Sequence, residues 1–243
     1  QLGRDTGVVQ LAAASLDNTG GKIIATDGGL NIDAASVANN NGWLQAAALM
    51  SIVTTALDNT GGTVLGGTSV TLARDATGAA LDHLTNASGL VEASNDLTIS
   101  AVSVDNTSGG LVGKTGSVAI TDNGSGQGLF TNTDGAVQAG GALTLATGQY
   151  ASDTSAALQA GTALDLSVTG AADNEGAITA GDGLSLSAAS LVNGAKGTIG
   201  ALAGDTMIAV HGNAASPALS NAGAIEDADV AGVLKVDATS LAT

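Results

Sequence analysis

The chain repeats one short unit along nearly its whole length, and this repetition limits the folds that it can adopt. In each unit, a segment aliphatic-x-Asn is followed by Gly, then by aliphatic-x-Ala, a Gly-rich gap and aliphatic-x-aliphatic. The unit recurs about every 20 to 27 residues, which is typical of solenoids, where each copy buries its apolar face against its neighbours.

Each unit ends with a triplet in which one aliphatic residue lies on each side of a middle residue. Because successive side chains of a strand point to opposite faces, the triplet predicts a short strand with both aliphatics inside and the middle residue outside. Middle residues such as Thr98 and Ser185 suit a solvated face. The aliphatic pairs are Leu30 and Ile32, Val70 and Leu72, Leu97 and Ile99, Val118 and Ile120, Leu143 and Leu145, Leu164 and Leu166, Leu184 and Leu186, Ile208 and Val210, and Leu234 and Val236.

A second aliphatic residue lies six positions before most pairs and predicts a second strand in each coil. Ala or Gly follows two residues later, and then residues that favour a turn. The Ala-rich stretch from Leu44 to Thr55 fits this pattern and is interpreted as another coil rather than a helix. The second aliphatics are Leu44, Val64, Val91, Val137, Leu158 and Ile178.

Asparagine marks a third position of the unit, each time close to a Gly. In stacked coils, equivalent residues lie about 4.8 Å apart, so their side-chain amides can hydrogen-bond in a ladder along the axis. Asn also tolerates the left-handed backbone that a tight corner requires. The alternative is that these residues occupy exposed turns only. The predicted ladder comprises Asn18, Asn39, Asn59, Asn86, Asn106, Asn132, Asn174, Asn193 and Asn221.

The composition fits stacked coils better than a compact globule. Aromatic residues make up 1% of the chain, whereas a globular core of this size draws much of its burial from them. The hydrophobic content of 44% and the mean hydropathy of +0.31 argue against disorder. About ten coils, each rising about 4.8 Å, would form a rod about 50 Å long. Longer gaps between repeats predict surface loops at residues 73–80, 122–128, 201–206, 212–217 and 227–232.

The repeats resemble those of filamentous haemagglutinin and of contact-dependent growth-inhibition exoproteins. The resemblance is carried by LDNTGG at residues 16–21 and 57–62, VDNT at 104–107 and AGGALTL at 139–145. It implies a right-handed parallel β-helix, exported through the outer-membrane transporter of a two-partner secretion system. It also implies a location outside the cell, either secreted or on the bacterial surface.

Features of the ends of such exoproteins are not found in this sequence. Family members begin with a secretion domain that carries Asn-Pro-Asn motifs, but the single proline, Pro217, follows Ser216, and no signal peptide is visible at Gln1. The Val-Glu-Asn-Asn element that precedes toxin domains is also absent. Residues 1–243 are therefore expected to form a single β-helical shaft segment, a fragment of a longer exoprotein.

Charge and cysteine content restrict the partners. The formal net charge of -16 would repel phosphate groups, so nucleic acid is not an expected partner. The chain has no cysteine and therefore no disulfide or thiolate site. No apolar run approaches the roughly 20 residues of a membrane-spanning helix, so no membrane span is expected.

No catalytic, cofactor or metal site is predicted from the sequence. His83 and His211 lie in different coils, with no carboxylate or serine at a suggestive spacing. Glu226, Asp227 and Asp229 could bind calcium weakly, but solvated charge is the favoured interpretation. Three glycosylation sequons occur, at Asn86, Asn106 and Asn123, and the first two fall on the predicted ladder, where burial would block modification.

Three functions remain as hypotheses. The favoured one is a structural shaft of an exoprotein, not an enzyme, that displays adhesive or toxic ends away from the cell. The second is an adhesin segment that binds a host or target-cell receptor or glycan through the loops at 73–80 or 122–128. The third is a β-helical polysaccharide lyase or hydrolase, for which the basic residues are few and dispersed. The sequence does not separate a host adhesin from a growth-inhibition exoprotein.

Overall fold

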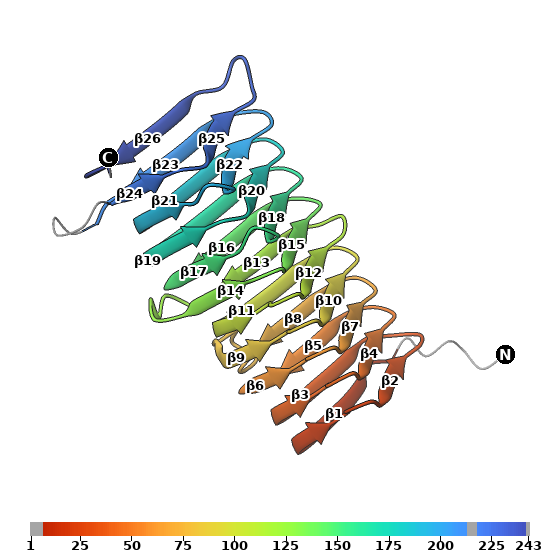
Figure 1. Cartoon of the computed structure of the whole chain (residues 1–243). Helices are drawn as coiled ribbons and strands as arrows, with labels where there is room; N and C mark the ends of the chain where they lie inside the picture. The colour runs from red at the N-terminus through yellow and green to blue at the C-terminus, as the bar shows by residue number, and fades with distance from the viewer. Residues whose placement is uncertain (1–6, 213–217, 242–243) are drawn as a thin grey trace.

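The computed structural model describes residues 7–212 and 218–241, and this part of the chain is all β-structure (Figure 1). Its 26 strands wind into about ten coils that stack as a parallel β-solenoid, with β1 at one end and β26 at the other. The predicted fold class is thereby confirmed. Pro217, most of the predicted loop at 212–217 and the first six residues lie outside the described part.

The strands form two sheets, a 16-stranded sheet that we call the long sheet and a ten-stranded sheet that we call the short sheet. The ten-stranded sheet contains β2 (Lys22–Ala25), β4 (Trp43–Ala46), β7 (Thr63–Gly66), β10 (Leu90–Ala93), β12 (Gly110–Gly113), β15 (Ala136–Ala139), β18 (Ala157–Ala160), β20 (Ala177–Ala180), β22 (Thr198–Ala201) and β25 (Ala224–Asp227). The 16-stranded sheet contains β1 (Val9–Asp17), β3 (Leu30–Ala38), β5 (Met50–Val53), β6 (Ala56–Asp58), β8 (Val70–Ala73), β9 (Leu81–Thr85), β11 (Leu97–Asp105), β13 (Val118–Thr121), β14 (Leu129–Asn132), β16 (Leu143–Thr147), β17 (Gln149–Ser152), β19 (Leu164–Asn174), β21 (Leu184–Asn193), β23 (Thr206–Val210), β24 (Leu219–Asn221) and β26 (Leu234–Ala238).

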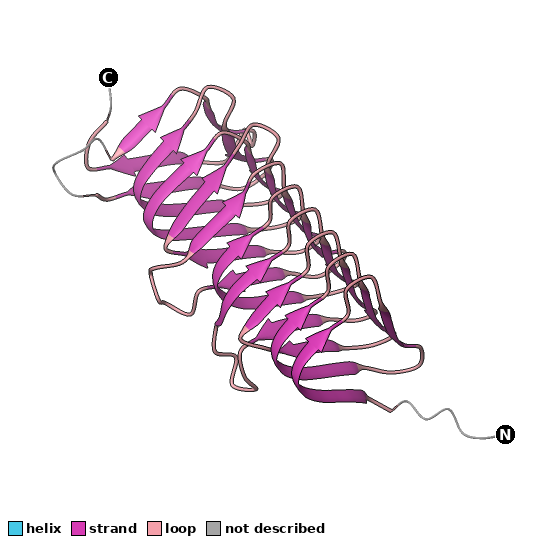
Figure 2. Ribbon diagram, turned by 60° about the horizontal axis from the view of Figure 1, so that its bottom comes forward, coloured by secondary structure: helices cyan, strands magenta, loops and turns pink. Residues whose placement is uncertain are grey.

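Like residues of successive coils lie over one another inside the solenoid. Leu143 pairs with Leu164, and Leu164 with Leu184, in parallel register, and each is at most 2% exposed. The second aliphatic of each coil forms its own column on the short sheet, where Leu158 pairs with Ile178. Figure 2 shows these strands side by side along the long axis, joined by turns at the corners.

Two fully buried members of the short-sheet column were missed because their spacing differs. Leu111 and Ile199 are fully buried in register with Val137 and Ile178, but each precedes the next long-sheet strand by seven positions instead of six. The turn between the two sheets is one residue longer in these coils, so a fixed-spacing rule does not find them.

Ile208 and Val210 lie inside as predicted, at 2% and 0% exposure, but two positions farther along the strand than the aliphatic pairs of the other coils. Ile208 aligns with Leu186, and the position over Leu184 is taken by Thr206, which is fully buried and donates its hydroxyl to the Glu226 carbonyl at 3.2 Å. Leu234 and Val236 of β26 were expected inside, yet they are 44% and 41% exposed because no described coil covers them.

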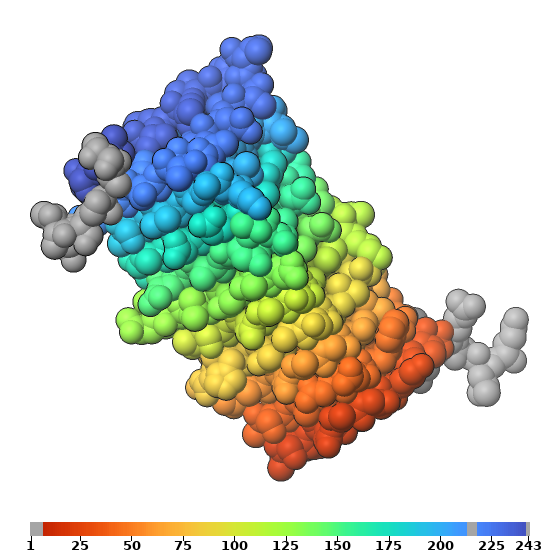
Figure 3. Space-filling model, in the orientation of Figure 1, coloured from red at the N-terminus to blue at the C-terminus, as the bar shows by residue number. Residues whose placement is uncertain are grey.

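Segments that follow one another in the sequence lie next to one another along the long axis of the molecule (Figure 3). Each coil therefore contacts chiefly the coil before it and the coil after it. This arrangement is quasi-one-dimensional, and its stability is the sum of coil and nearest-neighbour terms. The predicted insertions emerge between strands, with residues 74–80 after β8 and residues 122–128 after β13. No helix in the described ranges is long and apolar enough to cross a membrane.

Candidate functional site

The nine predicted asparagines occupy one corner of successive coils, where the long sheet ends. From Asn18 to Asn132, each side-chain Nδ2 donates to Oδ1 of the next asparagine at 2.7–2.9 Å. Asn174, Asn193 and Asn221 form a second run, with bonds of 2.8 and 2.7 Å. The structure therefore brings six of the asparagines into one row and three into another.

Burial makes these hydrogen bonds strong contributors to the corner. Asn59 has no exposed surface, and besides its bond to Asn86 it donates to the carbonyl oxygens of Gly62 at 3.1 Å and Leu90 at 3.3 Å. Its own Oδ1 accepts from Asn39 at 2.7 Å. A buried polar network is stabilising when every member is satisfied, and this repeat satisfies its amides from coil to coil.

One coil interrupts the row. Ser152 pairs in register with Asn132, so a hydroxyl takes the place of the amide, and it donates to Asn174 Oδ1 at 3.2 Å. Two residues earlier, Tyr150 stacks on Phe130 with ring centroids 6.2 Å apart. The Tyr150 hydroxyl lies near Ser152 and Asn132 but makes no hydrogen bond of good geometry, and burial raises the pKa of this phenol to about 12.

In the row from Asn18 to Asn132, the left-handed residue of each corner lies two positions after the ladder asparagine. Gly61 has φ of 61° and Asn41 of 53°, whereas none of the ladder asparagines has a positive φ. The next residue must also be glycine, because a Cβ at Gly62 would overlap the carbonyl oxygen of Asn39 in the preceding coil. The Asn-x-x-Gly spacing thus has a steric cause as well as a hydrogen-bonding one.

A recurring aspartate stabilises the same corner from outside. Asp58 Oδ1 accepts from the Thr60 amide at 3.1 Å and from its hydroxyl at 2.7 Å. Asp17 makes the equivalent contact with Thr19, whose side-chain and backbone groups hold the pKa of Asp17 below its ordinary value. These turns explain the Asp-Asn-Thr sequence, which the asparagine pattern alone does not.

The two predicted binding loops contact each other. Asn123 of the loop at 122–128 donates its Nδ2 to the Gly78 carbonyl oxygen at 2.7 Å, across 45 positions of sequence. The loop at 74–80 is ordered internally by Asp75, which accepts from the Thr77 hydroxyl, the Thr77 amide and the Ala79 amide. Together the loops form one raised feature on the long sheet, which we call the loop ridge (residues 74–80 and 122–128).

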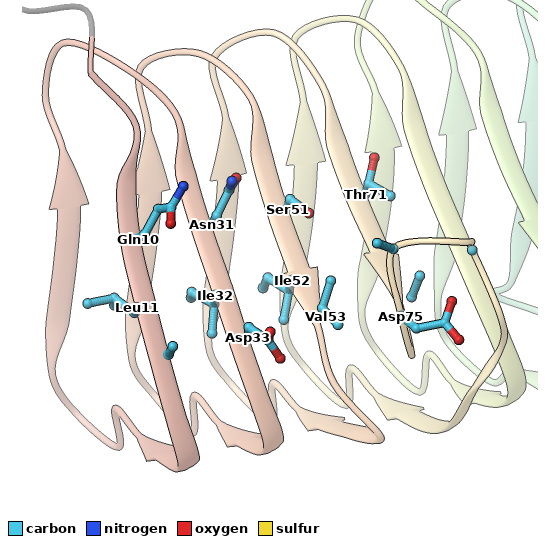
Figure 4. Close-up of a pocket in the computed structure, with 14 residues that line it drawn as sticks. Gln10, Leu11, Asn31, Ile32, Asp33, Ser51, Ile52, Val53, Thr71 and Asp75 are labelled. Carbon is cyan, nitrogen blue, oxygen red and sulfur yellow. The ribbon is translucent and has the colours of Figure 1, made fainter.

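A groove of about 440 Å³ lies between the 74–80 loop of the loop ridge and the outer face of β1, β3, β5 and β8. Figure 4 shows Gln10, Asn31, Ser51 and Thr71 on successive strands, with the loop that carries Asp75 at one end. These four residues share one register column, so the groove presents one polar side chain per coil.

The histidines have neighbours that the sequence did not indicate. His83 pairs in register with Ser103, but the Ser103 hydroxyl donates to the Asp82 carbonyl oxygen at 3.2 Å. His211 Nε2 lies 3.9 Å from a carboxylate oxygen of Asp237, and both side chains are more than half exposed. Neither pair shows the serine–histidine hydrogen bond of an activated nucleophile.

The acidic residues near the C-terminus stabilise the turn in which they lie. Asp229 accepts backbone amides of Ala231 and Gly204, both at 2.9 Å, and these bonds hold its pKa below the ordinary value. Asp227 Oδ1 accepts the Asp229 amide at 2.9 Å. Across residues 7–212 and 218–241, no group of three or more His, Cys, Asp or Glu side chains is placed to hold a metal ion.

The asparagines of the three glycosylation sequons differ in solvent exposure. Asn86 and Asn106 have no exposed surface and are members of the asparagine row. Asn123 is exposed in the loop ridge, with a left-handed backbone of φ 55°.

Comparison with known families agrees with this geometry. The haemagglutinin repeat matches residues 6–82, 66–149, 122–187 and 138–242, which together span nearly the whole chain. The chain belongs to the haemagglutinin repeat family. The resemblance seen in the repeats is thereby confirmed. Neither a curated protein nor a solved structure matches the chain significantly.

Proposed function

We propose that this chain is a shaft segment of a secreted or cell-surface exoprotein, which holds adhesive or toxic ends away from the cell. The observation that carries the proposal is the continuous parallel pairing from β1 to β26, with stacked apolar columns and no break between the coils of the described part. Haemagglutinin repeats are typical of secreted or surface adhesins, which supports the location and a non-enzymatic role.

The mechanism is mechanical. Each coil shares main-chain hydrogen bonds with both neighbours and removes apolar surface from water, at about 25 cal/mol per Å². Bending the rod would open pairing on one face and distort the buried asparagine rows on the corner. The net charge of -16 keeps such rods soluble and apart. Export through an outer-membrane transporter of a two-partner secretion system is the partner interaction that the family suggests.

Small-angle X-ray scattering at low concentration tests the shaft. A stack of ten coils predicts an elongated particle about 50 Å long, with a cross-section that stays constant along its length. Electron microscopy of longer chains with duplicated repeats should show straight rods whose length grows in proportion to the repeat number. A compact sphere or an expanded coil would refute the proposal.

Receptor or glycan binding is the second candidate function, and one observation favours it. The two inserted loops are joined by the Asn123–Gly78 bond, and the loop at 74–80 borders a groove, so the loops form one surface instead of two separate tips. Deleting residues 75–79 should abolish adhesion without loss of β-structure. Unchanged adhesion would refute a role of the loop ridge. No observation on the described residues favours the third hypothesis, a polysaccharide lyase or hydrolase.

A further inference from the structure

The groove beside the loop ridge has a floor of unpaired polar groups. Within the described chain, the side chains of Gln10, Asn31, Asp33, Ser51 and Thr71 make no hydrogen bond to protein. Asn86 and other asparagines of the corner, by contrast, are fully bonded. The floor thus presents amide, hydroxyl and carboxylate groups that are free to bind a molecule from solution.

The electrostatic character of the groove is anionic. Its lining includes the carboxylates of Asp33 and Asp75 and no Lys, Arg or His. Arg74, the nearest base in sequence, is committed to an ion pair with Asp82. Hydrogen bonds from the Thr77 hydroxyl and from two backbone amides hold the pKa of Asp75 below its ordinary value, so this carboxylate stays charged in mild acid. Sulfated or uronic acid chains would be repelled, whereas cations would be attracted.

The floor repeats along the solenoid axis. Gln10, Asn31, Ser51 and Thr71 are adjacent in register, so polar groups follow one another at the strand spacing of about 4.8 Å. One pyranose unit of an extended oligosaccharide has a comparable length. A sugar chain lying along the axis would therefore meet a hydrogen-bonding side chain at each unit.

A peptide fits the groove less well. Of the four strands under the groove, β3, β5 and β8 are paired with neighbours on both sides, and only β1, at the end of the stack, has a free edge for β-addition. Ile32 and Ile52 also line the groove, but they point inward with 1% and 0% exposure, so the large apolar side chains accessible in it are those of Leu11 and Val53, both half-buried. Hydroxyl-rich ligands suit such a floor better.

We propose that this groove binds an oligosaccharide that carries protonated amino groups, with Asp33 and Asp75 facing the amines and the Gln10–Thr71 column bonding to the hydroxyls. The inference rests on the second candidate function and specifies its ligand class. Binding is weak per site, because the floor has no aromatic platform and one exposed ion pair contributes little.

The test uses the whole chain and defined probes at mildly acidic pH. A glucosamine tetramer, whose amines are protonated, is titrated against isotope-labelled protein and followed by NMR shifts, in parallel with the neutral N-acetylated tetramer and with tetralysine. The glucosamine tetramer should bind most tightly and shift residues of β1, β3, β5 and β8. Preferential binding of tetralysine, or shifts located elsewhere, would overturn the proposal.

Variants identify the groove as the site. Asp33→Asn should weaken binding of the glucosamine tetramer about two- to fivefold, the range of one exposed ion pair. Asp165→Asn is the matched control, because Asp165 is an exposed outward residue farther along the same sheet. Equal effects of both variants, or an absence of binding by the native chain, would overturn the proposal. Scattering on the same samples distinguishes failure of the groove proposal from failure of the shaft proposal. An elongated particle that does not bind the glucosamine tetramer would refute the groove proposal and leave the shaft proposal intact.

Discussion

Replacement of Asn59 by alanine tests the claim that the buried asparagine row stabilises the solenoid. Asn59 lies in the middle of the first row, with no exposed surface. Its loss removes the donor to Asn86 Oδ1 at 2.8 Å and the acceptor of the Asn39 amide at 2.7 Å. Asn39 keeps its bonds to the carbonyls of Gly42 and Thr63, whereas Asn86 Oδ1 is left without a partner.

The expected cost follows from these contacts. One orphaned buried acceptor costs about 1–3 kcal/mol. The space left by the amide adds about 1 kcal/mol. The sum for Asn59→Ala is therefore about 2–4 kcal/mol in the free energy of unfolding. Asn31→Ala is the control, because this asparagine faces outward and makes no hydrogen bond within the described chain, and its cost should stay within about 0.5 kcal/mol.

Urea denaturation followed by circular dichroism measures both variants, and the m-value must be unchanged for the comparison to hold. A double-mutant cycle adds a stricter test. Asn59→Ala and Asn86→Ala should cost less together than the sum of the single changes, because each removes the partner of the other. Asn59→Ala and Asn193→Ala lie in separate rows and should be additive. If Asn59→Ala cost no more than Asn31→Ala, the asparagines would be turn residues only.

Three further predictions concern the same corner and its interruption. Gly62→Ala should destabilise the chain severely, since its Cβ would overlap the Asn39 carbonyl oxygen, whereas Gly183→Ala meets its nearest atom at 3.7 Å and should be mild in the same denaturation assay. Tyr150→Phe removes a buried hydroxyl without a hydrogen bond and should stabilise the chain by about 1 kcal/mol; destabilisation would show that the hydroxyl is satisfied. Native Tyr150 should ionise near pH 12, by ultraviolet titration, and because its folded pKa is above the unfolded value of about 10, stability should fall between these pH values in the native chain but less in the phenylalanine variant.

The repeat period was sufficient to predict the solenoid because the interactions of this fold are periodic. An inward residue such as Leu164 contacts its equivalents Leu143 and Leu184, so the same residue type at the same spacing encodes the same contact in every coil. Where the turn length changed, the prediction was incomplete, as at Leu111. Where a threonine took an interior position, as at Thr206, the aliphatic pattern gave the wrong alignment.

Contacts between residues on the surface could be identified only from the tertiary structure. The bond between Asn123 and Gly78 joins loops whose sequences are unrelated, and no repeat period relates residues 45 positions apart in two separate insertions. The anionic groove beside Asp75 arises in the same way, because an inserted loop forms one of its walls. The amino-acid sequence alone determined the coils, since stacking energy depends on which residues recur; the shape of the outer face was decided only by folding, because irregular loops are placed by contacts that no repeat encodes.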